Sequence, residues 1–439
     1  MAARGEDGSE AKLRKVVFLH PDLGLGGAEK LIVQAAVALQ EKGHEVIVYT
    51  SHFNAKRCFE ETKNLHVEVA GDWIPRSIAG YLHIIFALLR SLWLSCYVVC
   101  TCKADVFITD QIAAYNLFLR MFTSTPIVFY CHYPDLLLST RTSVIKKMYR
   151  LPFDILEEVG TWFADTVLVN SSFTADAFRK TFQCLSNVDI RVLYPAIALP
   201  NPEVLRRAIK TDALPTFVSI NRFERKKNIA LAIHAFAMLQ KMLYGKDGAK
   251  KVETDSKIQL IVAGGWDARV AENVEYHEEL VKLARSKYGL QKESVKFIRS
   301  FSDEDKLSLL ANAAAVLYTP ENEHFGIVPI EAMAHETPVI AQNNGGPKES
   351  IKDGVTGYLC ESNPKAWAAR MLTIVKDTKS SKIMGKNGRG RVQEKFSFAT
   401  FQAQFHDVVT SARHSSRAPL MILPAAFFLM LAMALWQCM

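Results

Sequence analysis

Two glutamates in the second half of the chain have the type and spacing that a nucleotide-sugar site needs. Glu323 lies in a loop after a predicted strand, and Glu331 lies in the predicted helix that follows, with seven residues between them. Seven residues make about two helical turns, so the two carboxylates can face different parts of one ligand, the sugar and the ribose. Carboxylates accept hydrogen bonds from hydroxyl groups, in which nucleotide sugars are rich.

Backbone and basic groups near these glutamates suit a diphosphate. The residues between the glutamates begin with His324, Phe325, Gly326 and Ile327, whose N–H groups would lie at a helix N-terminus, where anions bind. Arg222 and Lys227 follow another predicted strand end. A strand-end Arg with a nearby Lys can neutralise a leaving diphosphate without a metal, although a solvated basic loop is the other interpretation.

The first half offers a glycine-rich turn and a histidine, both at strand ends. Gly24, Gly26 and Gly27 precede a predicted helix, where backbone could approach a ligand, but a purely structural turn fits as well. The turn departs from a dinucleotide fingerprint because Glu29 stands where the third glycine belongs. His132, directly after a strand, could bond a sugar hydroxyl or the charge of a transition state, or be structural.

Two further segments at strand ends are candidates for ligand sites. The turn Asn343–Pro347 could cap a phosphate or a sugar with backbone groups. Asp303, Glu304 and Asp305 look like the D-x-D metal motif of some transferases, but they follow Ser302 and open a predicted helix, so we interpret them as first-turn capping charge. The sequence predicts no metal site and no cofactor.

These residues are positioned by short β-branched runs that alternate with helical patterns. Such alternation predicts two parallel, doubly wound sheets. Because ligands of such sheets bind beyond the carboxyl ends of the strands, the motifs are expected to converge in a cleft between two facing domains. The predicted strands are 16–19, 46–49, 106–109, 127–130 and 166–169, and then 216–220, 259–262, 295–298, 315–318 and 339–341.

The predicted domain order follows from these runs. The segment 245–256 is expected to be a surface loop within the second domain. The expected parts are a disordered N-terminus (1–13), an acceptor-side domain (14–200), a linker (201–214), a nucleotide-sugar-binding domain (215–396), a terminal helix (397–412) and a hydrophobic segment (418–436).

Composition narrows the class of protein. Hydrophobic residues make up 49% and charged residues 22%, which suits packed domains, and the net charge of +8 suits an anionic membrane surface or a phosphate-bearing substrate. No nucleic-acid-binding motif is present, so nucleic acid is excluded as a partner. The eight scattered cysteines indicate free thiols in a reducing compartment, and the charged N-terminus is unlike a signal peptide.

Two apolar stretches point to a membrane. Residues 418–436 carry no charge and follow Arg413 and Arg417, which predicts a tail anchor with its N-terminal flank in the cytosol. Residues 78–100 contain Arg90, and two interpretations remain open: a helix in the membrane surface with Arg90 at the headgroups, or a core helix. Cytosolic domains predict that the sequon at Asn170 carries no glycan.

Taken together, these motifs resemble glycosyltransferase family 4, whose fold is GT-B: two Rossmann-like domains that face each other across a cleft. The resemblance spans nearly the whole chain and rests on GLGGAE, the Arg222 and Lys227 pair, Glu323 and Glu331 with EHFG between them, and NNGGPKES. The segments HPDLGLGGAE, FYCHYPDLLL, SINRFERKKN, TPENEHFGIVP and RSFSD look like the members of that family that assemble N-glycan precursors.

This resemblance implies a retaining mannosyltransferase with GDP-mannose as donor. Its acceptor would be the dolichyl-diphosphate-linked oligosaccharide Man-GlcNAc2, which receives an α-1,3 and then an α-1,6 mannose at the cytosolic face of the endoplasmic reticulum membrane. Other mannosyltransferases of the pathway are conceivable partners. The residues implied in catalysis are His132, Glu323 and Lys227, and those implied in donor binding are Gly26, Gly27, Arg222, Lys227, His324, Phe325, Gly326, Ile327 and Glu331.

Three alternatives stand beside this hypothesis. One is another family-4 transferase, such as the N-acetylglucosaminyltransferase of GPI-anchor synthesis, which would use a UDP donor. Another is a non-catalytic scaffold subunit, against which the joint presence of Glu323, Glu331, Arg222 and Lys227 argues. The third is a nicotinamide oxidoreductase, against which the missing third glycine counts.

Overall fold

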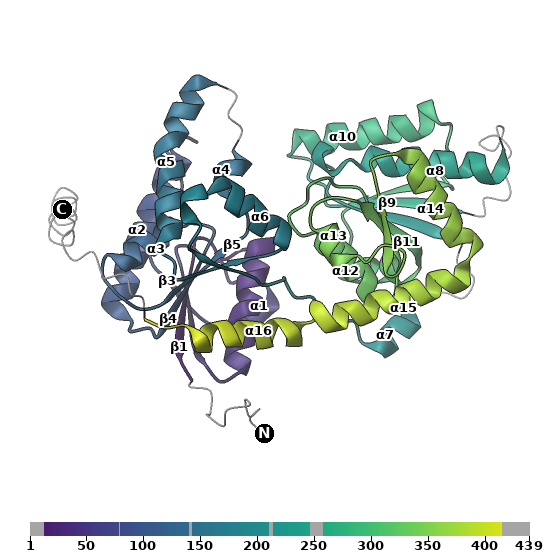
Figure 1. The fold of residues 1–439 in the computed structure, drawn as a ribbon. Helices are drawn as coiled ribbons and strands as arrows, with labels where there is room; N and C mark the ends of the chain where they lie inside the picture. Colours follow the sequence, from purple (N-terminus) through teal and green to yellow (C-terminus); the bar gives the residue numbers. More distant parts are fainter. Residues whose placement is uncertain (1–12, 79, 140–142, 210–213, 246–257, 415–439) are drawn as a thin grey trace. The chain divides into compact units, whose positions relative to one another are not determined.

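The chain folds into two compact units, seen in a computed structural model that describes residues 13–78, 80–139, 143–209, 214–245 and 258–414 (Figure 1). Unit 1 holds the chain up to Ala196 and again from Phe401, and unit 2 holds Ile197–Thr400. Each unit contains one parallel sheet, as the alternating strand and helix patterns predicted. The expected tail anchor, 418–436, and all but the first residue of the expected loop, 245–256, lie outside the described residues.

The sheet of unit 1 has seven parallel strands in the order β3-β2-β1-β4-β5-β6-β7. The five predicted strands of this half are confirmed, while the outer strands β3 and β7 were missed because they are short and half polar. The strands are β1 (Lys15–His20), β2 (Glu45–Thr50), β3 (His66–Val69), β4 (Val106–Asp110), β5 (Ile127–Cys131), β6 (Thr166–Val169) and β7 (Asp189–Val192).

Helices cover both faces of this sheet, so its central strands are apolar on both sides. In β1, Val17 and Leu19 pack into a core with Leu94 and Val98 of α2, whereas Phe18 points the other way, against Phe405 of α16. The helices are α1 (Gly27–Glu41), α2 (His83–Thr101), α3 (Ala114–Arg120), α4 (Asp135–Leu138), α5 (Val144–Trp162) and α6 (Ser172–Thr181), with the short helices η1 (Glu60–Asn64) and η2 (Gln183–Leu185).

The sheet of unit 2 has six parallel strands in the order β10-β9-β8-β11-β12-β13. All five predicted strands are confirmed, and β13 is additional, its glycine start having hidden it. The strands are β8 (Thr216–Ile220), β9 (Gln259–Gly264), β10 (Val295–Arg299), β11 (Ala313–Tyr318), β12 (Val339–Gln342) and β13 (Gly357–Cys360).

The core of unit 2 lies between this sheet and its helices, with Trp367 of α14 and Phe236 of α8 fully buried in one cluster. The helices are α7 (Pro202–Ala208), η3 (Arg225–Lys227), α8 (Ile229–Tyr244), α10 (Ala271–Lys282), η4 (Leu283–Lys287), α11 (Asp303–Ala311), α12 (Ile327–Ala334), α13 (Pro347–Ser350), α14 (Pro364–Lys376) and α15 (Thr378–Lys395). Helix α7 occupies part of the stretch expected to be a linker.

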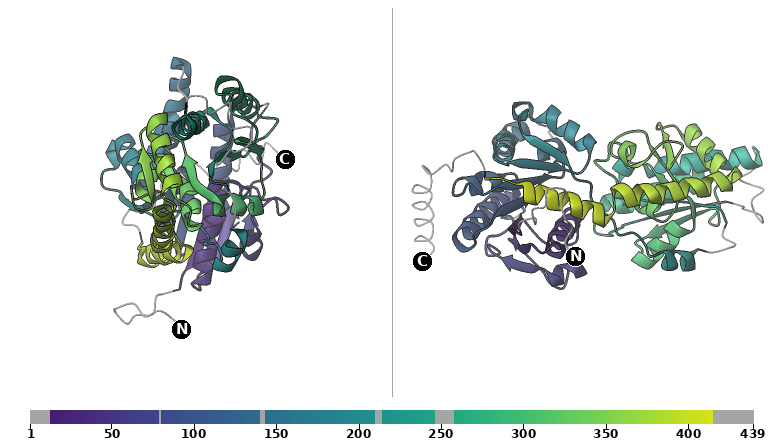
Figure 2. Two further views of the ribbon diagram at one scale, coloured as in Figure 1. Left: turned by 90° about the vertical axis from the view of Figure 1, so that its right-hand side faces the viewer. Right: turned by 60° about the horizontal axis from the view of Figure 1, so that its bottom comes forward.

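The last described helix, α16 (Phe398–Ser411), returns to unit 1 and lies along α1 (Figure 1 and Figure 2). The Gln402 amide donates to the Ala38 carbonyl of α1 at 3.2 Å, and the Phe405 ring lies 6.3 Å from that of Phe18. The Arg14 guanidinium donates to the carbonyls of Thr410 and Ala412, each at 2.7 Å, where it complements the negative end of the helix. Sequence periodicity predicted this helix but not its return.

The surroundings of Arg90 in helix α2 favour one of the two interpretations of residues 78–100, the core helix. Arg90 does not reach lipid headgroups: it is 6% exposed, donates to the Ser51 carbonyl at 3.0 Å and lies 3.2 Å from the Asp22 carboxylate. A central arginine that pairs inside the protein is typical of a packing helix. Among the described helices, α2 alone has the length and hydropathy to cross a membrane, and its inner face is buried against the sheet.

The strand orders place one topological switch point in each unit, where neighbouring strands send the chain in opposite directions. In unit 1 the switch lies between β1 and β4, and in unit 2 it lies between β8 and β11. Ligands of open parallel sheets bind beyond the carboxyl ends of the strands at such points. His20 and Asp110 end the two strands of the first switch, and Arg222 and Glu323 follow the strands of the second.

Candidate functional site

At the switch point of unit 2, the structure brings together two of the predicted residues. Lys227 ends η3, just after β8, and its Nζ bonds to the Oε1 of Glu323 in the loop after β11. The two residues are 96 positions apart in sequence, and their side chains are only 13% and 26% exposed. The Lys227 carbonyl also accepts a hydrogen bond from the Thr319 hydroxyl at 2.8 Å, which ties the two loops together.

The loop that carries Glu323 is braced by the Asn-Gly-Gly turn after β12. The N–H of Gly346 donates to the Glu323 carbonyl at 2.8 Å, and the Asn344 side-chain oxygen accepts from the Asn322 N–H at 2.8 Å. A Cβ on Gly346 would meet the Phe325 carbonyl oxygen at 2.2 Å, so only glycine permits this close approach. The turn for which the sequence predicted a possible cap on phosphate or sugar therefore supports the Glu323 loop, and its contact with a ligand stays a prediction.

Burial sets the protonation of the groups around Glu323. Burial raises the pKa of Tyr318 well above its usual range, and the charge of Glu323 beside it adds to the effect. Burial also lowers the pKa of His324, and although the charge of Glu323 opposes this lowering, the positive charge of Lys227 adds to it. Both rings are therefore neutral at pH 7.

The start of α12 lies where the sequence predicted it. Gly326, with φ of 80°, turns the chain into this helix, and Ile327 begins it. A residue other than glycine would be strained at this φ, so the glycine is required by the turn itself.

Glu331, on α12, is placed apart from Glu323 and has its own cation. Lys306 of α11 donates to Glu331 Oε1 at 2.5 Å, a partner that sequence reasoning did not identify. The other carboxylate oxygen, Oε2, is buried and has no hydrogen-bond partner among the described residues. A buried carboxylate oxygen without a donor is costly, and a ligand hydroxyl would satisfy it.

Arg222 lies at the carboxyl end of β8 as predicted, but no direct contact joins it to Lys227 or Glu323. Its side chain is 64% exposed, and its guanidinium pairs with the Glu224 carboxylate at 3.0 Å. An exposed pair of this kind contributes little to the stability of the fold. Arg222 can therefore leave Glu224 and bind a phosphate at little cost.

In unit 1, His132 belongs to a chain of three side chains at the switch point. Its Nε2 lies 3.1 Å from Asp110 Oδ2, and Asp110 Oδ1 lies 2.7 Å from His20 Nδ1. His20 and Asp110 are fully buried, while 26% of the His132 side chain is exposed. Sequence reasoning missed Asp110 and gave His20 no role, although both are polar residues that end apolar parallel strands.

The rest of His132 is held as firmly as its ring nitrogen. The Asn170 side-chain amide donates to the His132 carbonyl at 3.0 Å, and the Tyr130 ring lies 4.9 Å from the imidazole. Asn170 is 9% exposed, and its side-chain oxygen accepts from the hydroxyls of Ser171 and Thr174. A glycan on Asn170 would require this network to open.

The glycine-rich loop lies beside the same switch point, between β1 and α1. No atom lies within 4 Å of a Cβ placed on Gly27, and one on Gly26 would meet only the flexible carboxylate of Glu29. Packing and backbone conformation therefore do not require glycine at Gly27, and the open space there would let a ligand approach the helix N-terminus closely. This observation fits the predicted donor-binding role of Gly26 and Gly27 without testing it.

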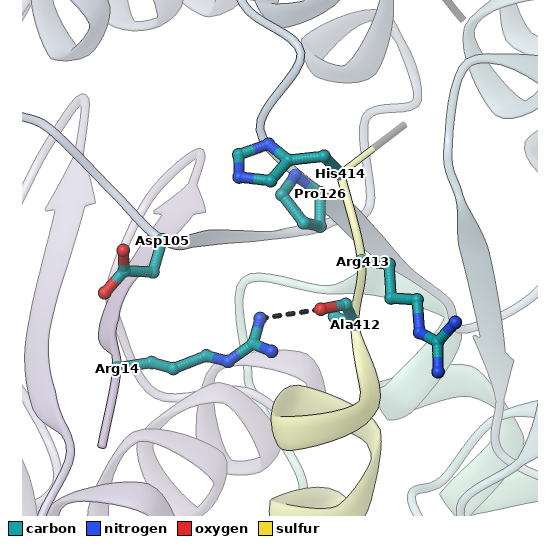
Figure 3. Close-up of a pocket in the computed structure, with 6 residues that line it drawn as sticks. All are labelled: Arg14, Asp105, Pro126, Ala412, Arg413 and His414. Carbon is teal, nitrogen blue, oxygen red and sulfur yellow. Dashed lines mark hydrogen bonds between the residues drawn. The ribbon is translucent and has the colours of Figure 1, made fainter. Parts of the chain in front are cut away.

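A separate cavity of about 270 Å³ lies at the opposite edge of the unit 1 sheet (Figure 3). Its lining includes the residues that precede β1, β4 and β5, together with the end of α16, and the close-up shows Arg14 directed at the Ala412 carbonyl. None of the predicted site residues lines it. The lining residues are Arg14, Asp105, Pro126, Ala412, Arg413 and His414.

The acidic run of α11 is the helix cap that its sequence predicted. Ser302 and Asp305 form a capping box, in which the Ser302 hydroxyl accepts from the Asp305 N–H and the Asp305 carboxylate accepts from the Ser302 N–H. Within the described part of the chain, no group of three or more His, Cys, Asp or Glu side chains is arranged to hold a metal ion.

Sequence comparisons agree with the division into two halves. Residues 25–199 match the family described as Glycosyltransferase Family 4, and residues 203–391 match Glycosyl transferases group 1. The chain is 43% identical to the alpha-1,3/1,6-mannosyltransferase ALG2 of Homo sapiens, over 93% of this chain and 98% of that protein. It is 44% identical to ALG2 of Rhizomucor pusillus (89% and 90%) and 40% identical to ALG2 of Saccharomyces cerevisiae (91% and 85%).

Solved structures share the fold at lower identity. A sucrose-phosphate synthase from Thermosynechococcus elongatus aligns with a TM-score of 0.69 at 20% identity, covering 90% of this chain and 98% of that one. Anabaena HepE, solved in complex with UDP, aligns with a TM-score of 0.67 at 20% identity, covering 90% and 100%. These similarities confirm the predicted fold class, GT-B with two Rossmann-like parallel-sheet domains.

The brace behind Glu323 predicts a stability effect. Gly346→Ala should destabilise unit 2 by about 1–3 kcal/mol, because the added methyl overlaps the Phe325 backbone although the φ of −58° at Gly346 suits alanine. Gly390→Ala on α15 is the matched control: nothing lies within 4 Å of its Cβ, and alanine favours a helix, so it should leave stability unchanged or raise it. Urea unfolding of both variants measures this, and equal midpoints would refute the brace.

Proposed function

Because the chain belongs to the family of the alpha-1,3/1,6-mannosyltransferases called ALG2, we propose specific roles in mannosyl transfer for the residues at its two switch points. The chain is a glycosyltransferase of N-glycan precursor synthesis and binds a nucleotide-sugar donor. The proposal extends to the donor GDP-mannose and to the acceptor, Man-GlcNAc2 carried on dolichyl diphosphate. The observation that carries the proposed residue roles is the Lys227–Glu323 pair at the unit 2 switch point.

In this proposal, unit 2 holds the donor. Arg222 and Lys227 neutralise the diphosphate, together with the backbone N–H groups of His324–Ile327 at the start of α12. Glu323 accepts hydrogen bonds from the mannose hydroxyls, and Glu331 accepts them from the ribose. The unpartnered Oε2 of Glu331 supports the second role, because a ribose hydroxyl would supply the donor that this buried oxygen lacks.

Breaking the bond between mannose and phosphate leaves negative charge on GDP and positive charge on the sugar ring. Lys227 stabilises the departing phosphate, and Glu323, which Lys227 holds in place, faces the sugar side. An α-linked donor that gives an α-linked product requires retention of configuration. We propose attack on the face that GDP leaves, with a phosphate oxygen taking the proton of the acceptor hydroxyl, so that no enzymic nucleophile is needed.

His132 would serve the same reaction from unit 1 by contacting the transferred mannose, and Gly26 and Gly27 would let the donor approach α1. The support is local: His132 is partly exposed at a strand end and held at its ring and carbonyl. Gly27 lacks a Cβ without any packing reason.

Similarity to ALG2 supports a location at the endoplasmic reticulum. We further propose that both units face the cytosol. The buried Asn170 side chain supports this, because a glycan attached there in the lumen would break its hydrogen bonds to His132, Ser171 and Thr174. The described cysteines are all free thiols, which suits a reducing compartment.

An exposed apolar stripe on α5 supports a membrane partner. Val144, Met148, Leu151 and Ile155 recur at helical spacing, and each is more than half exposed. Lys146 and Lys147 lie exposed beside the stripe. A helix with one apolar face and flanking lysines is typical of segments that bind an anionic membrane surface.

The stripe predicts membrane binding that does not need the hydrophobic tail. A chain that ends at His414, which keeps the contact between Arg14 and Ala412, should float with anionic phospholipid vesicles and lose this binding on Met148→Glu. Glu158→Gln, a charge change of the same size on the same helix, is the control and should float normally. Flotation of the Met148→Glu variant equal to that of its parent would exclude α5 as the binding surface.

The central test of the function uses the purified full-length protein with GDP-mannose and Man-GlcNAc2 on a short-lipid diphosphate. The wild type should transfer mannose, and UDP-N-acetylglucosamine should give no product. Lys227→Ala should lower kcat by about 100-fold or more, because the cation acts on charge that develops in the transition state. Lys226→Ala removes a neighbouring exposed lysine that pairs with Glu224 and should retain activity. Equal activity of both variants would reject the role of Lys227.

Substitutions of Glu323 and Glu331 should impair different steps of the reaction. Glu331→Gln should mainly weaken binding of GDP and raise KM, whereas Glu323→Gln should mainly lower kcat. Glu336→Gln, at a 40% exposed carboxylate just beyond α12, is the control for the loss of one charge. Calorimetric titration of GDP into each variant separates the roles, and they are reversed if Glu323→Gln loses GDP affinity while Glu331→Gln keeps it.

A further inference from the structure

We propose that His20 and Asp110 are positioning residues that set the proton on His132. In this arrangement a buried imidazolium of His20 neutralises Asp110, and Asp110 fixes neutral His132 with its proton on Nε2. The Nδ1 lone pair of His132 is then an acceptor for a hydroxyl of the transferred sugar. The inference rests on the proposed function, because it concerns the sugar that His132 would contact.

The protonation of His20 follows from its two partners. Its Nδ1 lies 2.7 Å from Asp110 Oδ1, and its Nε2 lies 3.1 Å from the Asp22 carbonyl oxygen. A carboxylate and a carbonyl can only accept hydrogen bonds, so both ring nitrogens must donate. A histidine that donates from both nitrogens is an imidazolium. Burial lowers the pKa of His20, but the charge and hydrogen bond of Asp110 outweigh burial and raise this pKa overall.

Asp110 is held as a carboxylate in the same way. Burial raises its pKa, but the charge of His20 and the hydrogen bonds from His132 and His20 outweigh burial, and the pKa is lowered overall. The backbone next to Asp110 is strained. Gln111, directly after Asp110, has φ of 58°, a conformation that costs energy for a residue other than glycine. The Ile112 N–H closes the turn by donating to the Asp110 carbonyl at 2.6 Å.

Asp110, Asp22 and Asp72 each pair with a cation other than His132. Asp110 pairs with His20, Arg90 of α2 lies 3.2 Å from Asp22 and 3.9 Å from Asp72, and Arg76 lies 3.4 Å from Asp22. Burial raises the pKa of two nearby tyrosines above the usual range, so both are neutral. The titratable and charged groups that act on this cluster from the neighbouring elements are Glu29 (α1), Arg90 (α2), Tyr115 (α3), Tyr130 and Cys131 (β5), and Asp22, Asp72 and Arg76 in loops.

His132 then has one defined tautomer. Asp110 Oδ2 accepts from its Nε2, and Asn170 and Tyr130 hold its carbonyl and its ring, so the proton stays on Nε2. A neutral acceptor suits the reaction, because positive charge develops on the sugar ring as GDP leaves. An imidazolium at this position would repel that charge and could not accept a hydroxyl hydrogen bond.

Removing the His20 charge tests this assignment. His20→Asn keeps a donor toward Asp110 but not the positive charge, so Asp110 should now draw a proton onto His132. Mannosyl transfer should fall at pH 7 and recover as the pH rises, with the acidic limb of the kcat profile moved upward by about one pH unit or more. A role in packing alone would lower activity at every pH and would not be rescued by alkali.

A second variant keeps the test decisive if His20→Asn folds poorly. The double variant His20→Asn with Asp110→Asn removes both buried charges. Its amide oxygen at position 110 can still accept from His132 Nε2, so the acidic limb should return toward the wild-type pH. His44→Asn, at a buried histidine that precedes β2 and so lies at the amino ends of the strands, away from the carboxyl ends that hold His20 and Asp110, is the control and should keep the wild-type profile. An unshifted profile in His20→Asn, or an equal shift in the double variant, overturns the inference.

Different results would reject the proposed function and the positioning role of His20 and Asp110. Absence of transfer from GDP-mannose by the wild type would reject the proposed function. Normal transfer by the wild type, with a His20→Asn profile that is lowered but not shifted, would reject the positioning role alone.

Discussion

The strand order of each parallel sheet is the constraint on which the rest of the structure depends. Neighbouring strands β1 and β4, and likewise β8 and β11, carry the chain away in opposite directions, so their carboxyl ends leave an edge that no crossover covers. Polar residues at these ends meet although they are distant in sequence. His20 meets Asp110 across 90 residues, and Lys227 meets Glu323 across 96. Each of these contacts is a charge pair whose side chains are partly or fully buried.

Such pairs gain little stability, since desolvation offsets much of their attraction, but they hold each side chain in one position. In the proposed function, the pair of unit 2 presents a cation to the diphosphate and a carboxylate to the sugar, and the Asn344–Gly346 turn supports the Glu323 loop. In unit 1 the fully buried pair leaves His132 as the only partly exposed member of its cluster of three. The two units thus share one arrangement, a charge pair between residues that follow or end neighbouring strands.

Much of this was predictable from sequence where the signal is local. The central strands follow from apolar runs, and the cap of α11 follows from Ser302 and its acidic neighbours. The partners of the site residues did not follow, because pairs such as Lys306 with Glu331 form between elements whose packing sequence periodicity does not specify. The sequence left two environments open for Arg90 for the same reason: its partners, Asp22 and the Ser51 carbonyl, come from loops after two other strands. The return of α16 to unit 1 is likewise a tertiary event.

The most direct test of the central claim, that side-chain cations rather than a metal carry the leaving-group charge, is the metal dependence of transfer. The rate of mannosyl transfer from GDP-mannose would be measured with purified protein in EDTA and again in magnesium. The account predicts equal rates, because Lys227 and Arg222 supply the positive charge at the end of β8. Loss of activity in EDTA, restored by titrating in a divalent ion, would contradict it.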